Sequence, residues 1–177
     1  PQRIVTLSST LDQIVLSVAP PERMAAVNAS MKDPINSNMV EVAEQVEKTI
    51  QRPSVEYIVS LHPDIVLIAD WQYPELADPL RESGLNVVVG RGPHNLAEVR
   101  DLVRLTTDAI GESRRGDVLL RKMDEKLSEI TEKVQSIPES ERKSVVFLSL
   151  MSTYGGIGSS FDDACHHAGV INGVSAY

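Results

Sequence analysis

The sequence predicts an α/β fold built on a mostly parallel sheet that helices cover on both faces. Three times, a short apolar strand ends in a polar loop that leads into a helix. The strands are residues 4–7, 65–69 and 87–89, and their loops begin at Ser8, Asp70 and Gly90. Strands that alternate with helices form parallel sheets, and such sheets bind ligands at the carboxyl ends of their strands. We therefore expect function to reside in these three loops.

The composition is that of a globular protein with an aliphatic core. Of the 177 residues, 42% are hydrophobic and only 4% are aromatic. The net charge of -8 argues against a nucleic-acid partner, which needs a basic footprint. No apolar run approaches the roughly 20 residues of a membrane-spanning helix. The single cysteine, Cys165, cannot form an internal disulfide and leaves the redox compartment open.

The first third of the chain predicts a strand, a helix and a second strand. Apolar residues spaced three and four apart predict a helix over 10–18, and Thr10 with Gln13 forms a capping-box pattern at its start. Pro20 and Pro21 end this helix, and residues 24–27 form the second strand. For residues 38–50 the spacing of apolar residues favours a helix, with a loop as the alternative.

The middle of the chain continues the alternation of helices and strands. A short helix over 54–61 precedes the most apolar strand, residues 65–69. Pro74 is suited to the first turn of the next helix, and Gly84 is placed to end it. A strand over 86–89 and a helix over 95–110 follow.

A long helix over 113–136 carries a narrow apolar stripe, and its other faces are charged. At about 1.5 Å per residue it would run roughly 35 Å. It is followed by Pro138, a polar run and a new strand over 145–148. The pattern fits a rigid connector between two sheet units, and equally an ordinary packing helix of one larger domain. The connector interpretation divides the chain into an N-terminal lobe (1–111), a connector (112–138) and the start of a second lobe (143–177).

The two ends of the sequence carry expectations of their own. Residues 1–3 lead straight into a strand, so no signal peptide is visible; the chain would be cytosolic, or a secreted protein cut to its mature part. A parallel strand near Tyr177 would lack partners, and we expect the second lobe to be truncated.

Three stretches resemble the substrate-binding proteins of ABC importers for iron-siderophores, haem and vitamin B12. Residues 1–8 are similar to the opening of that family, and 53–67 resemble its short helix ending in Leu-x-Pro-Asp before a strand. Residues 158–172 are similar to its second-lobe signature. The resemblance implies two Rossmann-like lobes joined by one rigid helix, with the ligand in the cleft between them.

The resemblance also implies a location and partners. The protein would be a monomer in the periplasm or outside the cell, with or without a lipid anchor. It would bind a small metal-chelate solute, need no cofactor of its own, and deliver the solute to an ABC permease in the membrane. Residues 28–52 match the family poorly.

The loop after the most apolar strand is the leading candidate for ligand binding. Trp71, Gln72 and Tyr73 follow Asp70 there, and Trp71 is the only tryptophan of the chain. Flat aromatic faces suit a macrocycle or a catecholate chelate. The alternative is that Trp71 only plugs the loop against the sheet.

The other two loops offer polar groups. Ser9 and Thr10 bring hydroxyl groups and helix N–H groups that suit an anionic or carbonyl group of a ligand, or they only cap the helix. Arg91 can pair with an anionic ligand, or it is a solvated surface residue. Asn28 to Met31 would line the same edge.

The second lobe contributes further candidates. Gly156-Ile157-Gly158 follows a strand, but Phe161 replaces the third glycine of a dinucleotide fingerprint. Under the resemblance this loop faces the cleft, and Tyr154 would contact the ligand.

A cluster near residue 165 has the composition of a metal site. Asp162, Asp163, Cys165, His166 and His167 are close in sequence, but helical spacing turns Cys165 inward and leaves two acid–histidine pairs outside. We therefore predict no metal site here. His62 and His94 are isolated in sequence, and we expect them to be structural or solvent-facing.

The family presents acidic residues on each lobe to arginines of the permease. Glu75 is the first-lobe candidate for this docking, and Asp162 or Asp163 is the second-lobe candidate. At Glu75 an acid also favours the helix dipole without any partner.

No catalytic motif of hydrolases, P-loop enzymes or zinc proteases is present in the sequence. The sequence thus predicts a binding protein and not an enzyme. The alternatives are a doubly wound α/β enzyme that uses Asp70 at the strand edge, and an interaction domain with no ligand. The identity of the ligand stays open among iron-siderophore, haem, cobalamin and a simple oxyanion such as molybdate.

Overall fold

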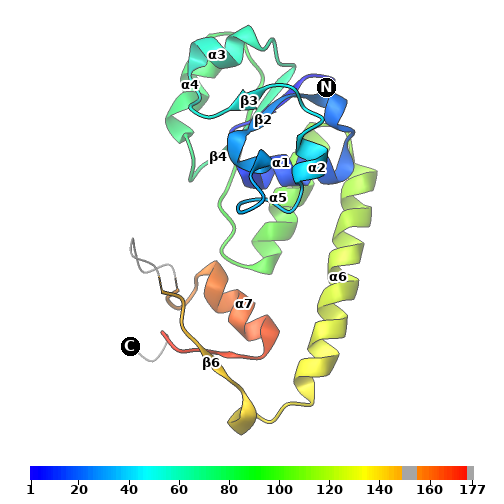
Figure 1. The fold of residues 1–177 in the computed structure, drawn as a ribbon, viewed down its shortest axis with the longest axis vertical. Helices are drawn as coiled ribbons and strands as arrows, with labels where there is room; N and C mark the ends of the chain where they lie inside the picture. The colour runs from blue at the N-terminus through cyan, green and yellow to red at the C-terminus, as the bar shows by residue number, and fades with distance from the viewer. Residues whose placement is uncertain (149–154, 175–177) are drawn as a thin grey trace. The chain divides into compact units, whose positions relative to one another are not determined.

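A computed structural model describes residues 1–148 and 155–174 of the chain. By its internal contacts the chain divides into two compact units. The first unit comprises Pro1–Gly92 and Leu102–Asp117, and the second comprises Pro93–Asp101 and Val118–Tyr177. A five-stranded sheet lies in the first unit and a two-stranded sheet in the second. Figure 1 labels several of their strands and the helices around them.

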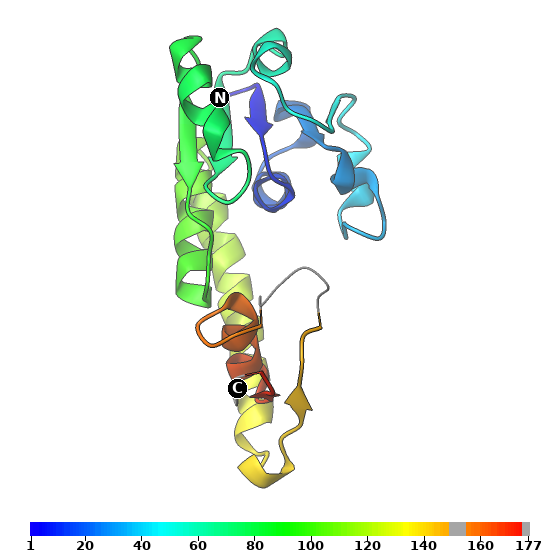
Figure 2. The same ribbon diagram turned by 90° about the vertical axis from the view of Figure 1, so that its left-hand side faces the viewer.

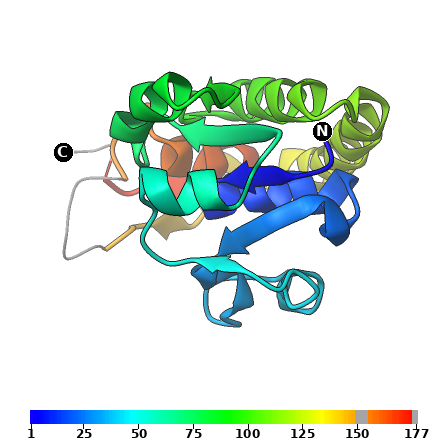
Figure 3. The same cartoon turned by 90° about the horizontal axis from the view of Figure 1, so that it is seen from above.

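All neighbouring strands of the five-stranded sheet are parallel. Their order is β3 (Thr49–Ile50), β2 (Met24–Asn28), β1 (Ile4–Thr6), β4 (Ile65–Ala69) and β5 (Val87–Gly90). Figure 3 shows this sheet as seen from above. The result confirms the predicted α/β class with a parallel sheet. Because the chain runs from β1 towards β2 and from β4 towards β5, it diverges between β1 and β4.

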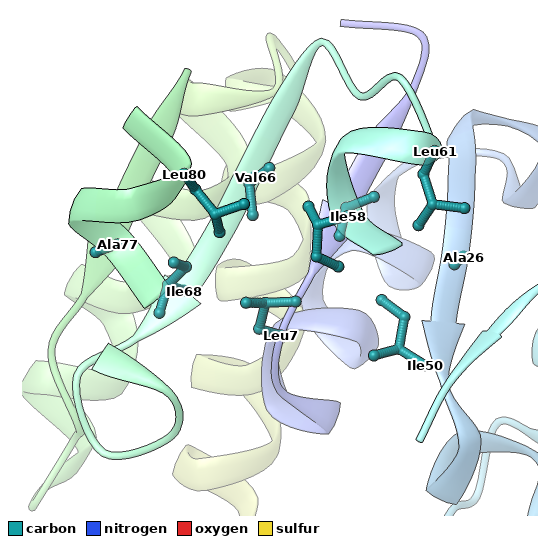
Figure 4. Packing of buried hydrophobic residues seen from close by; sticks show 10 residues of the cluster. Leu7, Ala26, Ile50, Ile58, Leu61, Val66, Ile68, Ala77 and Leu80 are labelled. Carbon is teal, nitrogen blue, oxygen red and sulfur yellow. The ribbon is translucent and has the colours of Figure 1, made fainter. Parts of the chain in front are cut away.

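Helices cover both faces of this sheet. On one face, α1 (Ser9–Val18) contacts β1, β2 and β4. The other face carries α3 (Val55–Ser60) and α4 (Ala77–Glu82). Figure 4 shows Ile58 of α3 and Leu80 of α4 over the strand residues of this face. Because strand side chains alternate between faces, Val66 and Ile68 pack under α3 and α4, and their neighbours in β4 face α1.

The remaining elements are short turns of helix and the parts that lead into the second unit. They are η1 (Pro21–Arg23), η2 (Ala29–Lys32), α2 (Val40–Ala43), η3 (Pro74–Leu76), α5 (Leu96–Ala109), α6 (Ser113–Gln135), η4 (Glu139–Glu141), β6 (Ser144–Val145), α7 (Ser160–Ala168) and β7 (Ile171–Asn172). No helix in residues 1–148 and 155–174 is long and apolar enough to cross a membrane.

The Leu-x-Pro-Asp stretch fastens the start of the chain at the amino end of β4. The Asp64 carboxylate accepts hydrogen bonds from the backbone N–H groups of Gln2 (2.6 Å) and Arg3 (2.9 Å). The Arg3 guanidinium in turn donates to the carbonyl of His62 (3.0 Å) and to that of Leu61. The bonds from Gln2 and Arg3 lower the pKa of Asp64.

The helix predicted over 38–50 is wrong for most of its length. Only Val40–Ala43 is α-helical, and Thr49–Ile50 forms the edge strand β3. Val46 and Ile50 are buried, as the helical interpretation required, but Ile50 is paired with Asn28 of β2. A spacing of four residues fits one face of a helix and also a turn followed by a strand.

The capping of α1 also differs from the prediction. The N-cap is Ser8, whose hydroxyl oxygen accepts from the N–H of Leu11 (3.2 Å). Thr10 is exposed within the first turn, so the predicted role of Thr10 as N-cap is wrong. The helix begins one residue earlier because β1 ends at Thr6 and the buried Ser8 already has extended backbone angles.

The second unit contains the predicted strand and helix in shortened form. β6 and β7 pair in parallel through Ser144 with Ile171 and Val145 with Asn172. Residues 146–148 lie outside the strand, so the prediction of a strand over 145–148 is wrong at its end. Cys165 of α7 is buried, as helical spacing predicted.

The long helix α6 runs from Ser113 to Gln135 without a break, close to the predicted 113–136 (Figure 2). Its predicted apolar stripe is only partly buried, and Leu120, which lies outside that stripe, is the buried leucine. The two compact units divide α5 and α6 between them. The predicted role of α6 as a rigid connector between lobes stays a prediction.

The start of α6 is tightly joined to the first unit. Arg23 pairs with the Glu112 carboxylate and donates to the carbonyls of Ile110 (2.7 Å) and Pro1 (2.9 Å). One turn later, a Cβ atom at Gly116 would lie 2.4 Å from the Thr107 hydroxyl oxygen. The α5–α6 corner of the first unit is therefore too close for any side chain at position 116.

A buried polar cluster ties the carboxyl ends of β1 and β2 together. The Asp12 carboxylate accepts hydrogen bonds from the Thr6 hydroxyl, the Asn28 side-chain amide and the Asn28 backbone N–H (2.9 Å). Burial raises the pKa of Asp12 to about 6, and the three hydrogen bonds offset only part of this effect.

We expect Asp12 to make the protein less stable as pH rises from about 4 to 6. The folded state holds the Asp12 proton more tightly than the unfolded state, so folding takes up a proton in this window. Asp12→Asn keeps an acceptor for Asn28 and a donor for Thr6 but cannot ionise. Relative to this variant, the wild type should lose roughly 3 kcal/mol of unfolding free energy between pH 4 and pH 7, measured by urea unfolding. Equal pH slopes for the two proteins would contradict this.

We expect Gly116→Ala to destabilise the protein by about 1–3 kcal/mol, because its Cβ overlaps Thr107. In an exposed helix position the same change stabilises by up to about 1 kcal/mol. The control is Ser128→Ala, an exposed position of the same helix, which should leave the unfolding free energy nearly unchanged or slightly higher. Urea unfolding measures the unfolding free energy of both variants. A Gly116→Ala variant that is more stable than the wild type would show that α5 and α6 leave room for a methyl group at position 116.

Candidate functional site

The candidate site of the first unit is the carboxyl edge of its sheet, at the divergence between β1 and β4. In open parallel sheets the helices that leave two such strands go to opposite faces, and a crevice remains between the loops. The loops at this edge follow β1 at Leu7, β2 at Ala29, β4 at Asp70 and β5 at Arg91. The sequence predicted three of these four loops as the functional edge and placed the fourth, at Asn28 to Met31, along the same edge.

Trp71 is held half-exposed at this edge by the loop that follows β5. Asp70 Oδ1 accepts a hydrogen bond from the N–H of Gly92 (2.7 Å), which joins the loops after β4 and β5. A Cβ atom at Gly92 would lie 3.0 Å from Cε3 of Trp71, so the indole rests against the glycine backbone. The side chain is nevertheless 44% exposed. Trp71 therefore presents aromatic surface to solvent while its other side rests against the loop, and its role in ligand binding stays a prediction.

Gln72 and Tyr73 play different parts in the same loop. The N–H of Gln72 donates to the carbonyl of Ala69 (3.0 Å) and closes a tight turn directly after β4. Tyr73 has a left-handed backbone (φ 60°) and packs against the core cluster under α4. Both side chains are half-buried, so Trp71 is the most accessible of the three predicted contacts.

The polar candidates lie at the same edge. Ser9 is the first residue of α1 and is half-buried, and Thr10 follows it on the exposed side of the first turn. Arg91 is exposed in the loop after β5, next to the Gly92 that supports Trp71. The parallel sheet thus brings Ser9, Trp71 and Arg91 to one edge.

Sequence reasoning missed the buried cluster of Asp12, Thr6 and Asn28 beneath this edge. Asn28 was expected only as an edge residue, yet its side chain is buried on Asp12. The only signal in the sequence was an aspartate next to the apolar stripe of α1. An acid near a helix start is ordinarily a favourable partner of the helix dipole, and the pattern does not reveal its burial.

In the second unit, Asp162 and Asp163 are engaged within the unit. Asp162 accepts hydrogen bonds from the Asn172 side chain (2.8 Å) and from the N–H of Gly158 (2.9 Å), which lower its pKa. Asp163 accepts from the N–H of Leu96 (2.9 Å) and lies 3.8 Å from His167. These two acids thereby fasten α7 to β7, to the start of α5 and to the loop before α7.

A polar cavity of about 480 Å³ lies beside the start of α7 within the second unit. Its walls include His94, Ser159, His166 and the inward-facing Cys165, whose thiol has a pKa raised by burial. Among the described residues, no three His, Cys, Asp or Glu side chains are grouped to hold a metal ion. Tyr154, the predicted ligand contact of this unit, lies outside the described residues.

Comparison with known proteins gives the family. A protein-family model described as "Periplasmic binding protein" matches residues 4–177 of the chain. The chain is 26% identical over 149 residues to the uncharacterized ABC transporter substrate-binding lipoprotein YvrC of Bacillus subtilis. The aligned residues make up 82% of this chain and 46% of that protein.

Solved structures share the fold at low sequence identity. The periplasmic haem-binding protein RhuT of Roseiflexus superposes with a TM-score of 0.77 at 24% identity, over 97% of this chain and 65% of that one. The molybdate-binding protein MolA of Haemophilus influenzae gives 0.78 at 16% identity, over 99% of this chain and 61% of that one.

The chain thus spans about half the length of its curated relative and less than two thirds of these two structures. The match nevertheless extends from the first strand to the last residue. The chain therefore belongs to the periplasmic binding protein family, the substrate-binding proteins of ABC transporters, as the resemblance in the sequence predicted.

Proposed function

We propose that the protein captures a metal-chelate solute outside the cytoplasmic membrane and delivers it to an ABC permease. The observation that carries this proposal is the half-exposed indole of Trp71 at the divergence between β1 and β4. Membership of the periplasmic binding protein family supports both the binding role and the extracytoplasmic location. The B. subtilis relative is described as a lipoprotein, which is compatible with a lipid anchor.

The residues at this edge favour a ligand that is flat and anionic. Trp71 offers an aromatic face for stacking and apolar burial. Arg91 and the N-terminal turn of α1 at Ser9 and Thr10 suit carboxylate or other anionic groups. A haem or an iron-siderophore combines these features, and haem is the named ligand of RhuT. From the resemblance alone, Tyr154 is proposed as a contact from the second lobe, with Gln72 and Tyr73 beside Trp71.

The competing functions have weaker support. An enzyme that used Asp70 has weaker support because the family binds substrates without catalysis. Asp70 Oδ1 accepts the Gly92 N–H and so joins two loops. A domain without ligand is disfavoured by membership of a family of substrate-binding proteins. Molybdate, the ligand named for MolA, is a small oxyanion and would make no use of an aromatic face.

We expect Trp71→Ala to weaken solute binding about tenfold or more, because the indole supplies stacking and apolar contact area. Isothermal titration calorimetry with haemin, ferrichrome, cyanocobalamin and molybdate measures this without relying on tryptophan fluorescence. Val118→Ala is the matched control, since Val118 is 42% exposed on α6. Its dissociation constant should stay within about twofold of the wild type. Wild-type protein that binds none of these four solutes would contradict the proposed function.

Glu75 is the proposed contact of this unit with the permease. It is exposed in η3, directly after the Trp71 loop. Asp162 and Asp163 are weaker candidates in the second unit, because their carboxylates already hold α7 to its neighbouring elements.

We expect Glu75→Gln to lower solute uptake through the permease while leaving the dissociation constant for the solute unchanged. The reason is that the change removes a charge that would pair with an arginine of the permease and touches no solute contact. Uptake into proteoliposomes and calorimetry measure the two quantities. The control is Asp78→Asn, an exposed acid on the following helix, and equal uptake by all three proteins would remove Glu75 from the docking surface.

A further inference from the structure

Ile35 is the most exposed large apolar side chain of the first unit, at 91% of its accessible surface. The other two in this unit, Trp71 and Leu105, are 44% and 40% exposed. Single exposed apolar residues are common on proteins and carry no message by themselves. What distinguishes Ile35 is the turn that holds it and the edge on which that turn lies.

A well-ordered turn holds Ile35 at its tip. The N–H of Asn36 donates to the carbonyl of Asp33 (3.0 Å), so Pro34 and Ile35 are the central residues of a four-residue turn. Asp33 Oδ1 also accepts the N–H of Ile35 (2.9 Å), and Asp33 Oδ2 accepts the side chain of Asn36 (2.6 Å). The turn follows η2, whose Met31 is fully buried.

Isoleucine at this place serves no local purpose. Aspartate at the first position and proline at the second are favoured in such turns, and the third position accepts most residues when its φ is negative, as it is at Ile35. Ile35 occupies that third position and gains nothing from packing, because its side chain lies in solvent. A rigid turn that displays an apolar side chain is instead suited to contact, since little conformational freedom is lost on binding.

The turn lies on the functional edge of the sheet. It belongs to the loop that leaves the carboxyl end of β2, and Trp71 belongs to the loop that leaves the carboxyl end of β4. Strands β2 and β4 are the two neighbours of β1. The two loops that flank the end of β1 thus each carry an exposed, large apolar side chain, and between them lies the polar start of α1.

We propose that Ile35 is a second apolar ligand contact of the solute site, and that the solute has an extended apolar surface, as a macrocyclic metal chelate does. This inference rests on the proposed function and narrows it. A small hydrated oxyanion makes no use of two apolar contacts on the loops that flank the end of β1. A broad chelate buries both of them and places its anionic groups towards Ser9 and Arg91.

The test is calorimetry with four solutes on the purified chain and its variants. The solutes are haemin, cyanocobalamin, ferrichrome and sodium molybdate. Ile35→Ala should weaken the binding of the chelate that the wild type binds about tenfold, because the contact loses three carbon atoms. Ile35→Leu should restore most of the affinity, and Asp33→Ala, which releases the turn, should lower it by an intermediate factor.

The matched control is Ile137→Ala, the same substitution at an isoleucine that is 40% exposed in the second unit. It should leave the dissociation constant within about twofold of the wild type. Because Ile35 packs against nothing, its variants should unfold at the wild-type urea midpoint, so a loss of binding reports a lost contact.

Each outcome decides between the two proposals. If a chelate binds and Trp71→Ala weakens it but Ile35→Ala does not, the Ile35 contact is overturned and the proposed function stands. If only molybdate binds, both the apolar-solute inference and the metal-chelate solute of the proposed function are overturned, and solute binding itself stands. Ile35→Ala that lowers uptake through the permease at an unchanged dissociation constant assigns the residue to docking and overturns its role as a ligand contact. A wild type that binds none of the solutes overturns both proposals.

Discussion

The pairing of β1 with β4 is the constraint on which the rest of the first unit depends. Both strands are buried on both faces, so the chain must leave each of them through a helix that covers the sheet. From β1 it leaves towards β2 with α1 on one face, and from β4 it leaves towards β5 with α4 on the other (Figure 4). Connections between neighbouring parallel strands are nearly always right-handed, so two connections that run in opposite directions along the sheet place their helices on opposite faces. The carboxyl ends of these two strands therefore stay uncovered by their own connections, and the site arises there.

The same edge contains a buried carboxyl group, that of Asp12, which reduces the stability of the fold. A carboxyl group whose pKa is raised to about 6 by burial opposes folding at neutral pH, yet Asp12 is kept directly beneath the loops after β1 and β2. Its three hydrogen bonds fix Asn28 and Thr6, so the two loops start from a rigid base. Rigid support of this kind lowers the entropy lost when loop residues contact a ligand. At this edge Asp12 therefore lowers the stability of the fold and at the same time holds the two loops in place for contact with a ligand.

The predictability of the structure from sequence follows the burial of each element. The continuous apolar run of residues 65–69 was sufficient to predict β4, because a strand buried on both faces has no other pattern. Residues 38–50 failed because Val46 and Ile50 satisfy both helix and turn–strand spacing, and only the pairing of Ile50 with Asn28 separates them. The candidate edge was predictable because topology alone places it. The burial of Asp12 and the exposure of Ile35 were not, because each depends on contacts between segments far apart in the chain.

The two edges of the sheet differ in how their side chains are used. At the amino edge, Asp64 and Arg3 close the chain start with hydrogen bonds to backbone groups. At the carboxyl edge, Trp71 and Ile35 are displayed to solvent on loops that are themselves well hydrogen-bonded. Backbone strain does not make this distinction, since His62 at one edge and Tyr73 at the other both have positive φ. The distinction lies in apolar surface held open by ordered loops, which the folding of the unit does not require. That surplus is the structural basis for proposing the carboxyl edge as the binding edge.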